Sequence, residues 1–80
     1  MTPVADIDQE VTRIVAKVAK TEAEKLVPST RLAEDLMIKS IGRIELGALL
    51  DDRFGTRTTN FEIRRPKTIQ ELVELFAGKL

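Results

Sequence analysis

Apolar residues recur at spacings of three and four in three stretches of the chain, which is the pattern of an amphipathic helix. The first stretch predicts a helix over residues 3 to about 19, with Pro3 in its first position and Thr2 as a possible cap. The second predicts a helix over residues 40–54, and the third a helix from residue 68 to the end. The apolar positions are Val4, Ile7, Val11, Ile14, Val15 and Val18 in the first, Ile41, Ile44, Leu46, Leu49, Leu50 and Phe54 in the second, and Ile69, Leu72, Val73, Phe76 and Leu80 in the third.

Residues that favour helix boundaries stand at the ends of the second and third helices. Ser40 is a good N-cap residue, and Gly55 stands where a left-handed C-terminal cap belongs. Thr68 and Glu71 have the spacing of a capping box. We therefore expect these two helices to begin at Ser40 and Thr68.

The stretch between the first two helices is predicted to be a long loop. Residues 20–35 are mostly polar and are interrupted by Pro28, so Leu26, Val27 and Leu32 are expected to pin the loop to the core. A short helical turn around residues 21–24 is possible because Thr21 and Glu24 have a capping-box spacing.

The stretch between the last two helices is polar and basic. In residues 56–67 only Phe61 and Ile63 are expected to be buried, and Asn60 could cap a one-turn helix that Pro66 would end. A strand at 56–63 is an alternative, but no other segment would pair with it. The sequence thus predicts an all-α fold with three long helices and a short one before the last.

The composition excludes several kinds of chemistry. The 80 residues contain no Cys and no His, so a thiol nucleophile, a zinc finger and a histidine base are excluded, and we expect no metal site. Thirteen basic and thirteen acidic residues give a net charge of zero, which provides no overall bias toward nucleic acid or a membrane surface. No apolar run is long enough to span a bilayer and no signal peptide is evident, which predicts a soluble, cytoplasmic protein.

The second helix contains the most informative surface. At 3.6 residues per turn, Ile44, Gly47 and Asp51 each lie within about 40° of Ser40 around the helix axis, and the four are predicted to share an outward face. Ser40 would stand at the helix N-terminus, where it could simply cap the helix. The same position suits a phosphate ester, because free N–H groups and the helix dipole stabilise negative charge there.

The run from Leu32 to Phe54 resembles the acyl carrier protein family, whose members show Asp-Leu-Gly-x-Asp-Ser-Leu followed by a helix with Glu-Leu. Asp35 and Leu36 match the opening pair, Ser40 matches the modified serine, and Ile41 replaces the Leu that follows it. Further matches are Glu45, Leu46 and Phe54, and the predicted order of helices resembles the family over nearly the whole chain, residues 1–80.

The resemblance implies a four-helix carrier bundle in which Ser40 bears a 4'-phosphopantetheine arm that holds acyl groups as thioesters. The implied partners are a phosphopantetheinyl transferase and the acyl-transfer and synthase enzymes of fatty-acid, lipid or polyketide biosynthesis, with a monomeric carrier that is not itself an enzyme. The bundle interior is expected to shelter the acyl chain. Its predicted walls are Ile41, Leu46, Leu49, Leu50 and Phe54 against Ile69, Leu72, Val73 and Phe76, with Phe61 and Ile63 closing one side.

Three positions depart from the family pattern. Met37 replaces its Gly, Lys39 the acid before the serine, and Gly42 the acid two residues after it. Since enzymes that read carriers present basic surfaces, the loss of acids indicates a specialised carrier rather than the main fatty-acid carrier. The predicted partner-binding residues are Lys39, Ile41, Ile44, Glu45, Ala48, Asp51 and Asp52.

Other functions remain as alternatives. A carrier-like interaction module without the arm is favoured by Lys39 alone. Residues 55–67 hold four bases and one acid, a net charge of +3, which indicates either a solvated turn or a patch that contacts phosphate or a partner. Nucleic-acid binding through Arg57, Arg64 and Arg65 is disfavoured by the zero net charge and the lack of a basic recognition helix. An exposed serine without a base is not expected to be a nucleophile by itself.

Overall fold

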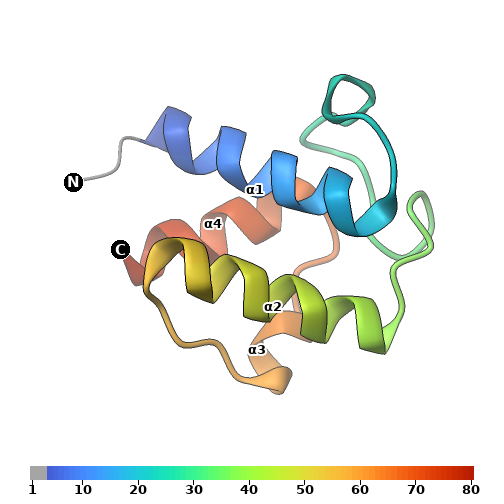
Figure 1. Ribbon diagram of the computed structural model, residues 1–80. Helices are drawn as coiled ribbons and strands as arrows, with labels where there is room; N and C mark the ends of the chain where they lie inside the picture. Colours follow the sequence, from blue (N-terminus) through green and yellow to red (C-terminus); the bar gives the residue numbers. More distant parts are fainter. Residues whose placement is uncertain (1–3) are drawn as a thin grey trace.

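The computed structural model describes residues 4–80, which form four α-helices and one short 3-10 helix (Figure 1). The helices are α1 (Val4–Ala19), α2 (Ser40–Phe54), α3 (Asn60–Arg64) and α4 (Ile69–Lys79), and the 3-10 helix η1 (Ala23–Lys25) follows α1. The all-α prediction with three long helices and one short helix is confirmed. The expected roles of Thr2 and Pro3 lie outside the described residues.

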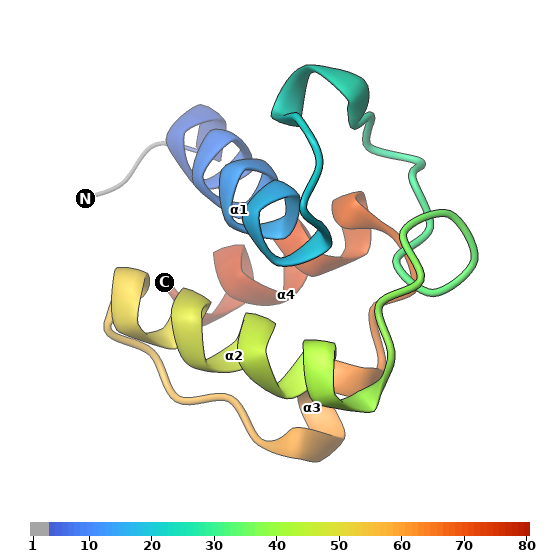
Figure 2. The same ribbon diagram turned by 45° about the vertical axis from the view of Figure 1, so that its right-hand side comes forward.

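The first helix packs against both α4 and α2, and α3 packs against α2 (Figures 1 and 2). The core between them is built from the inward stripes that the sequence predicts for the three long helices. Val11, Leu46, Leu50, Leu72 and Phe76 have no exposed surface. Three predicted positions are exceptions: Ile41 is 84% exposed, Phe61 is 75% exposed and Leu80, the last of the third stripe, is 56% exposed, so the expectation that they face the core is wrong.

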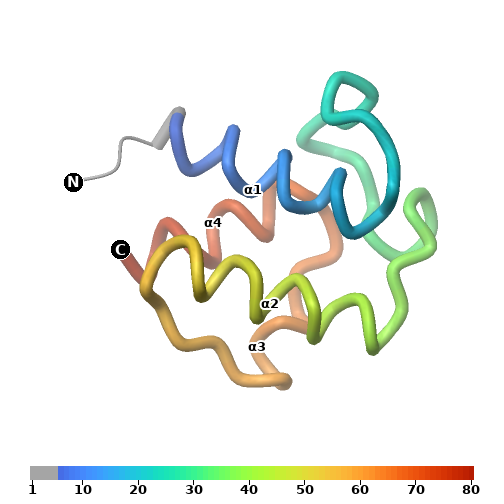
Figure 3. The backbone as a smooth tube through the Cα atoms, viewed as in Figure 1, coloured from blue at the N-terminus to red at the C-terminus, as the bar shows by residue number. Residues whose placement is uncertain are grey.

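The long first loop is tied to the beginning of α4 by main-chain hydrogen bonds. The Leu32 N–H donates to the Lys67 carbonyl (2.9 Å), the Ile69 N–H to the Thr30 carbonyl (3.1 Å) and the Gln70 N–H to the Pro28 carbonyl (2.9 Å). Figure 3 shows the loop passing from the end of α1 to the start of α2 beside this segment. Of the three predicted anchors, Leu32 is buried and Leu26 packs against the core, whereas Val27 is 54% exposed and does not anchor the loop.

The helix boundaries confirm some predicted caps and correct others. Gly55 ends α2 in the left-handed conformation (φ 68°), and the Thr68 side chain caps α4 by accepting from the Glu71 N–H (3.2 Å), both as predicted. At α3 the cap is Thr59 rather than Asn60, because Thr59 and Glu62 form a reciprocal capping box. The predicted turn at residues 21–24 is found two residues later, as η1.

Two further expectations can be compared with the described residues. Within residues 4–80 the only extended pairing is an isolated bridge between Arg31 and Thr68, so the alternative strand at 56–63 is not formed. None of the helices in this part of the chain is both long and apolar enough to cross a membrane.

Candidate functional site

Ser40 is the first residue of α2 and is exposed. The N-cap is Lys39, one residue earlier than predicted, and it makes no side-chain cap hydrogen bond. The Arg43 N–H donates to the Lys39 carbonyl (2.9 Å), which places Ser40 inside the first turn. The prediction that Ser40 is the N-cap is therefore wrong, and its side chain is not required to cap the start of the helix.

A phosphate ester on the Ser40 hydroxyl fits these surroundings. Ser40 stands at the positive end of the dipole of a 15-residue helix, where first-turn N–H groups favour an anion. The Lys39 side chain is exposed beside it, and the first turn of α2 contains no acidic residue that would repel a phosphate. Among residues 4–80 no group of acidic side chains is arranged to hold a metal ion.

The segment that leads into Ser40 is shaped by a tight turn. The Asp35 carboxylate accepts from the Arg31 N–H (2.9 Å) and from its guanidinium (3.1 Å), and these bonds, the backbone one first, lower the pKa of Asp35. The Ile38 N–H donates to the Leu32 carbonyl (2.9 Å), which turns the Ile38 side chain into the core. Asp35, one residue of the resemblance, thus shapes the turn that presents Ser40.

Two residues of this segment have unusual backbone or packing requirements. Met37, which replaces the glycine of the family pattern, has a left-handed backbone (φ 58°) that favours glycine. At Gly42 an added Cβ would approach the Ile38 side chain to 2.8 Å, so α2 and Ile38 can pack this closely only because Gly42 lacks a side chain. The close approach offers a structural reason for glycine at a position where the family has an acid.

An open groove of about 620 Å³ lies beside Ser40, between the end of α1 and the start of α2. Its polar lining residues are Lys39, Ser40 and Glu45, while Gly42 contributes backbone. Its apolar lining residues come from α1, from the loop and from α2: Val18, Ala19, Leu36, Met37, Ile38 and Ile41. The groove thus joins the candidate phosphate position directly to an apolar surface.

The predicted partner-binding residues do not all share one surface. Lys39, Ile41, Ile44, Glu45, Ala48 and Asp52 are exposed. Asp51 is half-buried, and its carboxylate accepts from the Thr56 hydroxyl (2.7 Å), the Thr58 N–H (2.8 Å) and the Thr58 hydroxyl (2.7 Å). Gly47 is buried against Ile63. The expectation of an outward face that includes Gly47 and Asp51 is therefore wrong, because α3 and the connection before it cover that part of α2.

Sequence reasoning missed the role of Arg43. Its side chain is buried, and its guanidinium donates to the carbonyls of Ile63 (3.0 Å) and Pro66 (2.6 Å). Burial lowers the pKa of Arg43, and the Glu34 carboxylate partly opposes that shift. Arg43, Gly47 and Asp51 are spaced by four residues and lie on the side of α2 that α3 and its flanking segments cover. That spacing alone gives no sign that Arg43 is buried, because its partners lie 20 and 23 residues away.

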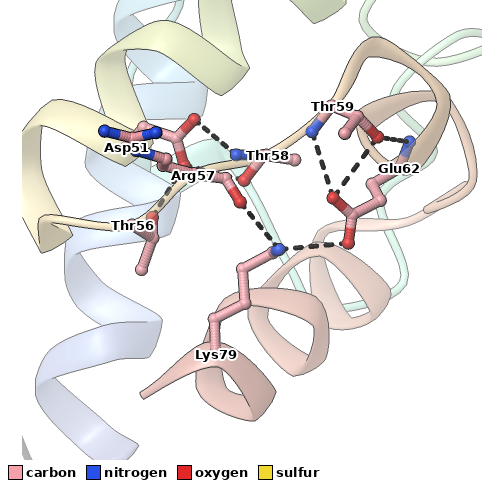
Figure 4. A network of polar contacts seen from close by, with 7 residues as sticks. All are labelled: Asp51, Thr56, Arg57, Thr58, Thr59, Glu62 and Lys79. Carbon is pink, nitrogen blue, oxygen red and sulfur yellow. Dashed lines mark hydrogen bonds and ion pairs between the residues drawn. The ribbon is translucent and has the colours of Figure 1, made fainter.

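The connection between α2 and α3 is held by further polar contacts (Figure 4). The Lys79 ammonium donates to the Arg57 carbonyl (2.9 Å) and to the Glu62 carboxylate (3.0 Å), while the Thr59 N–H donates to Glu62 (3.1 Å). The bond from the Thr59 N–H, then the bond from Lys79, lower the pKa of Glu62. The segment is therefore fixed from both α2 and α4.

Comparisons with known proteins agree with this arrangement. A family model described as "Phosphopantetheine attachment site" matches residues 9–76. An acyl carrier protein of Thermosynechococcus vestitus is 32% identical over 76 residues, which cover 95% of this chain and 94% of that protein. An acyl carrier protein of Thermobifida fusca is 25% identical over 60 residues, covering 75% of this chain and 76% of the relative. The chain therefore belongs to the acyl carrier protein family, whose members are phosphopantetheine-bearing carriers and not catalysts.

Proposed function

We propose that Ser40 carries the 4'-phosphopantetheine arm and that the protein is a specialised carrier, which presents acyl thioesters to a dedicated set of biosynthetic enzymes. The observation that carries the proposal is the exposed Ser40 in an uncapped first turn of α2. The Ser40 oxygen would form a bond to the phosphorus of coenzyme A that bears pantetheine. The bond from that phosphorus to the adenosine half would break, and the serine proton would pass to the transferase.

Intact mass tests the attachment site. Incubation with coenzyme A and a broad-specificity phosphopantetheinyl transferase should add one phosphopantetheine to the wild type and to Ser29→Ala, and none to Ser40→Ala. Ser29 is the matched control because it is the only other serine and is also exposed. An unmodified wild type would instead favour the interaction module without an arm, and a modified Ser40→Ala would place the arm elsewhere.

The specialised role is supported by the charges around Ser40. Lys39 is exposed beside the serine, Gly42 supplies no charge, and Asp51 is engaged within the fold. Only Glu45 and Asp52 remain as exposed acids on α2. An enzyme with a basic docking surface would therefore gain little attraction at this site and would meet Lys39 as a like charge.

The modification rate measures that repulsion. With a transferase that has a basic docking surface, Lys39→Asp should be modified severalfold faster than the wild type at low salt, and the difference should shrink as salt screens the charges. Lys17→Asp makes the same charge change on an exposed position of α1 and should leave the rate nearly unchanged. Equal rates for wild type and Lys39→Asp at every salt concentration would contradict the charge argument for a specialised carrier.

A further inference from the structure

The outward side of α3 combines an exposed aromatic side chain with two cations. Phe61 is 75% exposed, although Ile63, two residues later, is buried. Arg64 and Arg65 are also exposed, and they follow Phe61 by three and four residues, which places the three side chains on one side of the helix. In Figures 1 and 2, α3 lies at the lower edge of the molecule with α2 above it, so the far side of α3 faces away from the bundle. We call Phe61, Arg64 and Arg65 the α3 patch.

The positive charge of the α3 patch is not neutralised within the fold. Glu62, the only acid among residues 55–67, is half-buried and pairs with Lys79 (3.0 Å). In the part of the chain that the structure describes, Arg64 and Arg65 belong to no ion pair. Adjacent cations without acidic partners repel one another and attract an acidic surface.

The acids of α4 compensate only part of this charge. Arg65 borders a hollow of about 320 Å³ that Glu71 and Glu74 also line. The Glu71 carboxylate is engaged at the start of α4, where it accepts from the Lys67 N–H (3.2 Å). Glu74 is thus the one further carboxylate beside the patch that is exposed and belongs to no ion pair within residues 4–80. With two arginines against one such acid, the patch stays cationic.

The backbone beneath the patch is held rigidly, although a helix of five residues would not be stable alone. The Arg43 guanidinium binds the carbonyls of Ile63 (3.0 Å) and Pro66 (2.6 Å), which flank the two arginines of the patch. At the other end of α3, Thr59 and Glu62 form the capping box. A surface that is fixed before binding loses little conformational freedom when a partner arrives.

The chemistry of the patch fits a protein better than a membrane or a nucleic acid. Aromatic and arginine side chains are enriched in protein interfaces, where a few of them carry most of the binding energy. A helix that lies in a membrane surface needs a long apolar face, whereas α3 exposes one apolar anchor on five residues. The zero net charge and the lack of a basic recognition helix disfavour nucleic acid.

We propose that the α3 patch docks against an acidic surface of a partner protein, in which an apolar pocket receives Phe61 and carboxylates at the rim pair with Arg64 and Arg65. None of the residues that line the groove beside Ser40 belongs to the patch. The proposal therefore adds a second surface to the carrier and does not depend on the arm. A partner held there leaves the Ser40 end of α2 accessible to the enzymes that act on the arm.

The probe is a set of small three-helix-bundle proteins, selected from a library with randomised surface positions for binding to the full chain without the arm. The selected binders should be rich in Asp, Glu and apolar residues, and they should change the amide chemical shifts around residues 60–65. Affinity should fall about tenfold in Phe61→Ala and about a hundredfold when Arg64→Glu and Arg65→Glu are combined. Salt should weaken binding to the wild type.

Two matched controls separate the patch from general stickiness and charge. Val27→Ala truncates another exposed apolar residue (54% exposed), and Lys17→Glu combined with Lys25→Glu makes the same change in net charge at exposed positions elsewhere. Both should keep nearly the wild-type affinity. The Arg64/Arg65 double variant should melt close to the wild type, because neither arginine belongs to an ion pair within residues 4–80.

Several results would overturn the docking surface. These are selected binders that are basic, binders that shift the amides of Ile41 and Ile44 instead, and an affinity that is unchanged in Phe61→Ala. Binding to phosphatidylglycerol vesicles that is lost in the Arg64/Arg65 double variant, without acidic binders from the library, would assign the patch to a membrane and also overturn the proposal. Because the selection uses protein without the arm, each of these results leaves the proposed attachment at Ser40 to its own test.

Discussion

The side of α2 that faces α3 differs sharply from the end of α2 that bears Ser40. On the α3 side, Arg43 and Asp51 place their polar atoms against main-chain and hydroxyl groups of residues 56–66. At the Ser40 end, the helix begins without a side-chain cap and exposes Ile41, and the preceding Met37 has a strained backbone. Because both regions involve the same helix, the periodicity of α2 alone does not show which of its residues bond within the fold and which are exposed.

This difference separates stability from function within one helix. Polar groups that bond within the chain stabilise the fold and are withdrawn from any partner, as for Asp51. The exposed side chains at the Ser40 end, those of Lys39, Ser40 and Ile41, remain open to an attached group. Substitutions on the α3 side should therefore change the free energy of unfolding, and substitutions at the Ser40 end should change modification instead.

The largest expected effect is at Arg43. Arg43→Ala removes one hydrogen bond to α3 and one to the segment after it, and leaves the Ile63 and Pro66 carbonyls without this donor, so the free energy of unfolding should fall by about 3 kcal/mol. Arg57→Ala is the control, since Arg57 is exposed, and it should change stability by less than about 0.5 kcal/mol. Urea unfolding measures both. Equal stability of the two variants would show that Arg43 does not clamp α3.

Asp51 should come next. Asp51→Ala removes the acceptor of three hydrogen bonds from Thr56 and Thr58, and we expect a loss of about 2 kcal/mol. The neighbouring Asp52 is exposed, and Asp52→Ala should cost less than about 0.5 kcal/mol. Denaturant unfolding of the two variants shows which of the two aspartates stabilises the fold and which has a side chain free for a partner. A larger loss of unfolding free energy in Asp52→Ala than in Asp51→Ala would contradict the assignment of Asp51 to the fold.

Gly55 tests the backbone at the end of α2. Gly55→Ala should lower the free energy of unfolding by about 1 kcal/mol, because the residue has a positive φ and nothing lies near the added Cβ. Gly78 lies within α4 and also has open space around it, so Gly78→Ala should stabilise by up to about 1 kcal/mol. The melting temperature should fall in Gly55→Ala and rise in Gly78→Ala. A shift in the same direction for both variants would contradict the claim that Gly55 is required for its positive φ.

A smaller effect is expected from the two ion pairs of Glu10, one within α1 and one that joins α1 to the end of α2. The Glu10 carboxylate pairs with Arg13 (3.1 Å) and with Arg53, and these bonds, the one from Arg13 first, lower the pKa of Glu10 to about 2. Since the pKa of an unfolded Glu is about 4.3, the folded state favours the charged form. The stabilisation is fully present above that value and is lost as the pH falls toward 2.

Glu10→Gln should therefore lower stability slightly at pH 7 and flatten its decline between about pH 4.5 and pH 2. High salt should weaken the effect, because the groups are close to solvent. Asp8→Asn, which neutralises an exposed acid on the same helix, should leave the decline nearly as it is. Unfolding at a series of pH values tests this, and identical profiles for wild type and Glu10→Gln would contradict it.

The smallest change in stability is expected at Ser40. Ser40→Ala should alter the free energy of unfolding by less than about 0.3 kcal/mol, because Ser40 lies after the N-cap and supplies no cap. Thr59→Ala removes a true capping side chain and should cost about 1 kcal/mol. Thermal melts measure both, and a loss at Ser40 as large as that at Thr59 would show that Ser40 does help to hold the helix.

Sequence periodicity predicted the three long helices, the left-handed cap at Gly55 and the cap at Thr68 because each depends on residues within one or two turns. The caps of α2 and α3 were placed one residue too late, since Lys39 and Thr59 stand just before the better-looking Ser40 and Asn60. The residue preferences at helix starts cannot show which of two adjacent residues is the N-cap.

The errors at Ile41, Phe61 and Arg43 have a different origin. Periodicity assumes that apolar residues are buried and charged residues exposed, and each of these residues departs from that rule. The Arg43 partners lie 20 and 23 residues away, beyond the range of any local pattern. The groove beside Ser40 likewise depends on α1 and α2 meeting in space.

The main-chain bonds between the first loop and the start of α4 have a consequence for folding kinetics. They join Pro28, Thr30 and Leu32 to residues 67–70, so nearly half of the chain must be closed into a loop before they form. Such non-local closure slows folding relative to bundles with only local contacts. The amide protons of Leu32, Ile69 and Gln70 should then exchange with solvent only in openings that release loop and helix together, which makes them one cooperative unit.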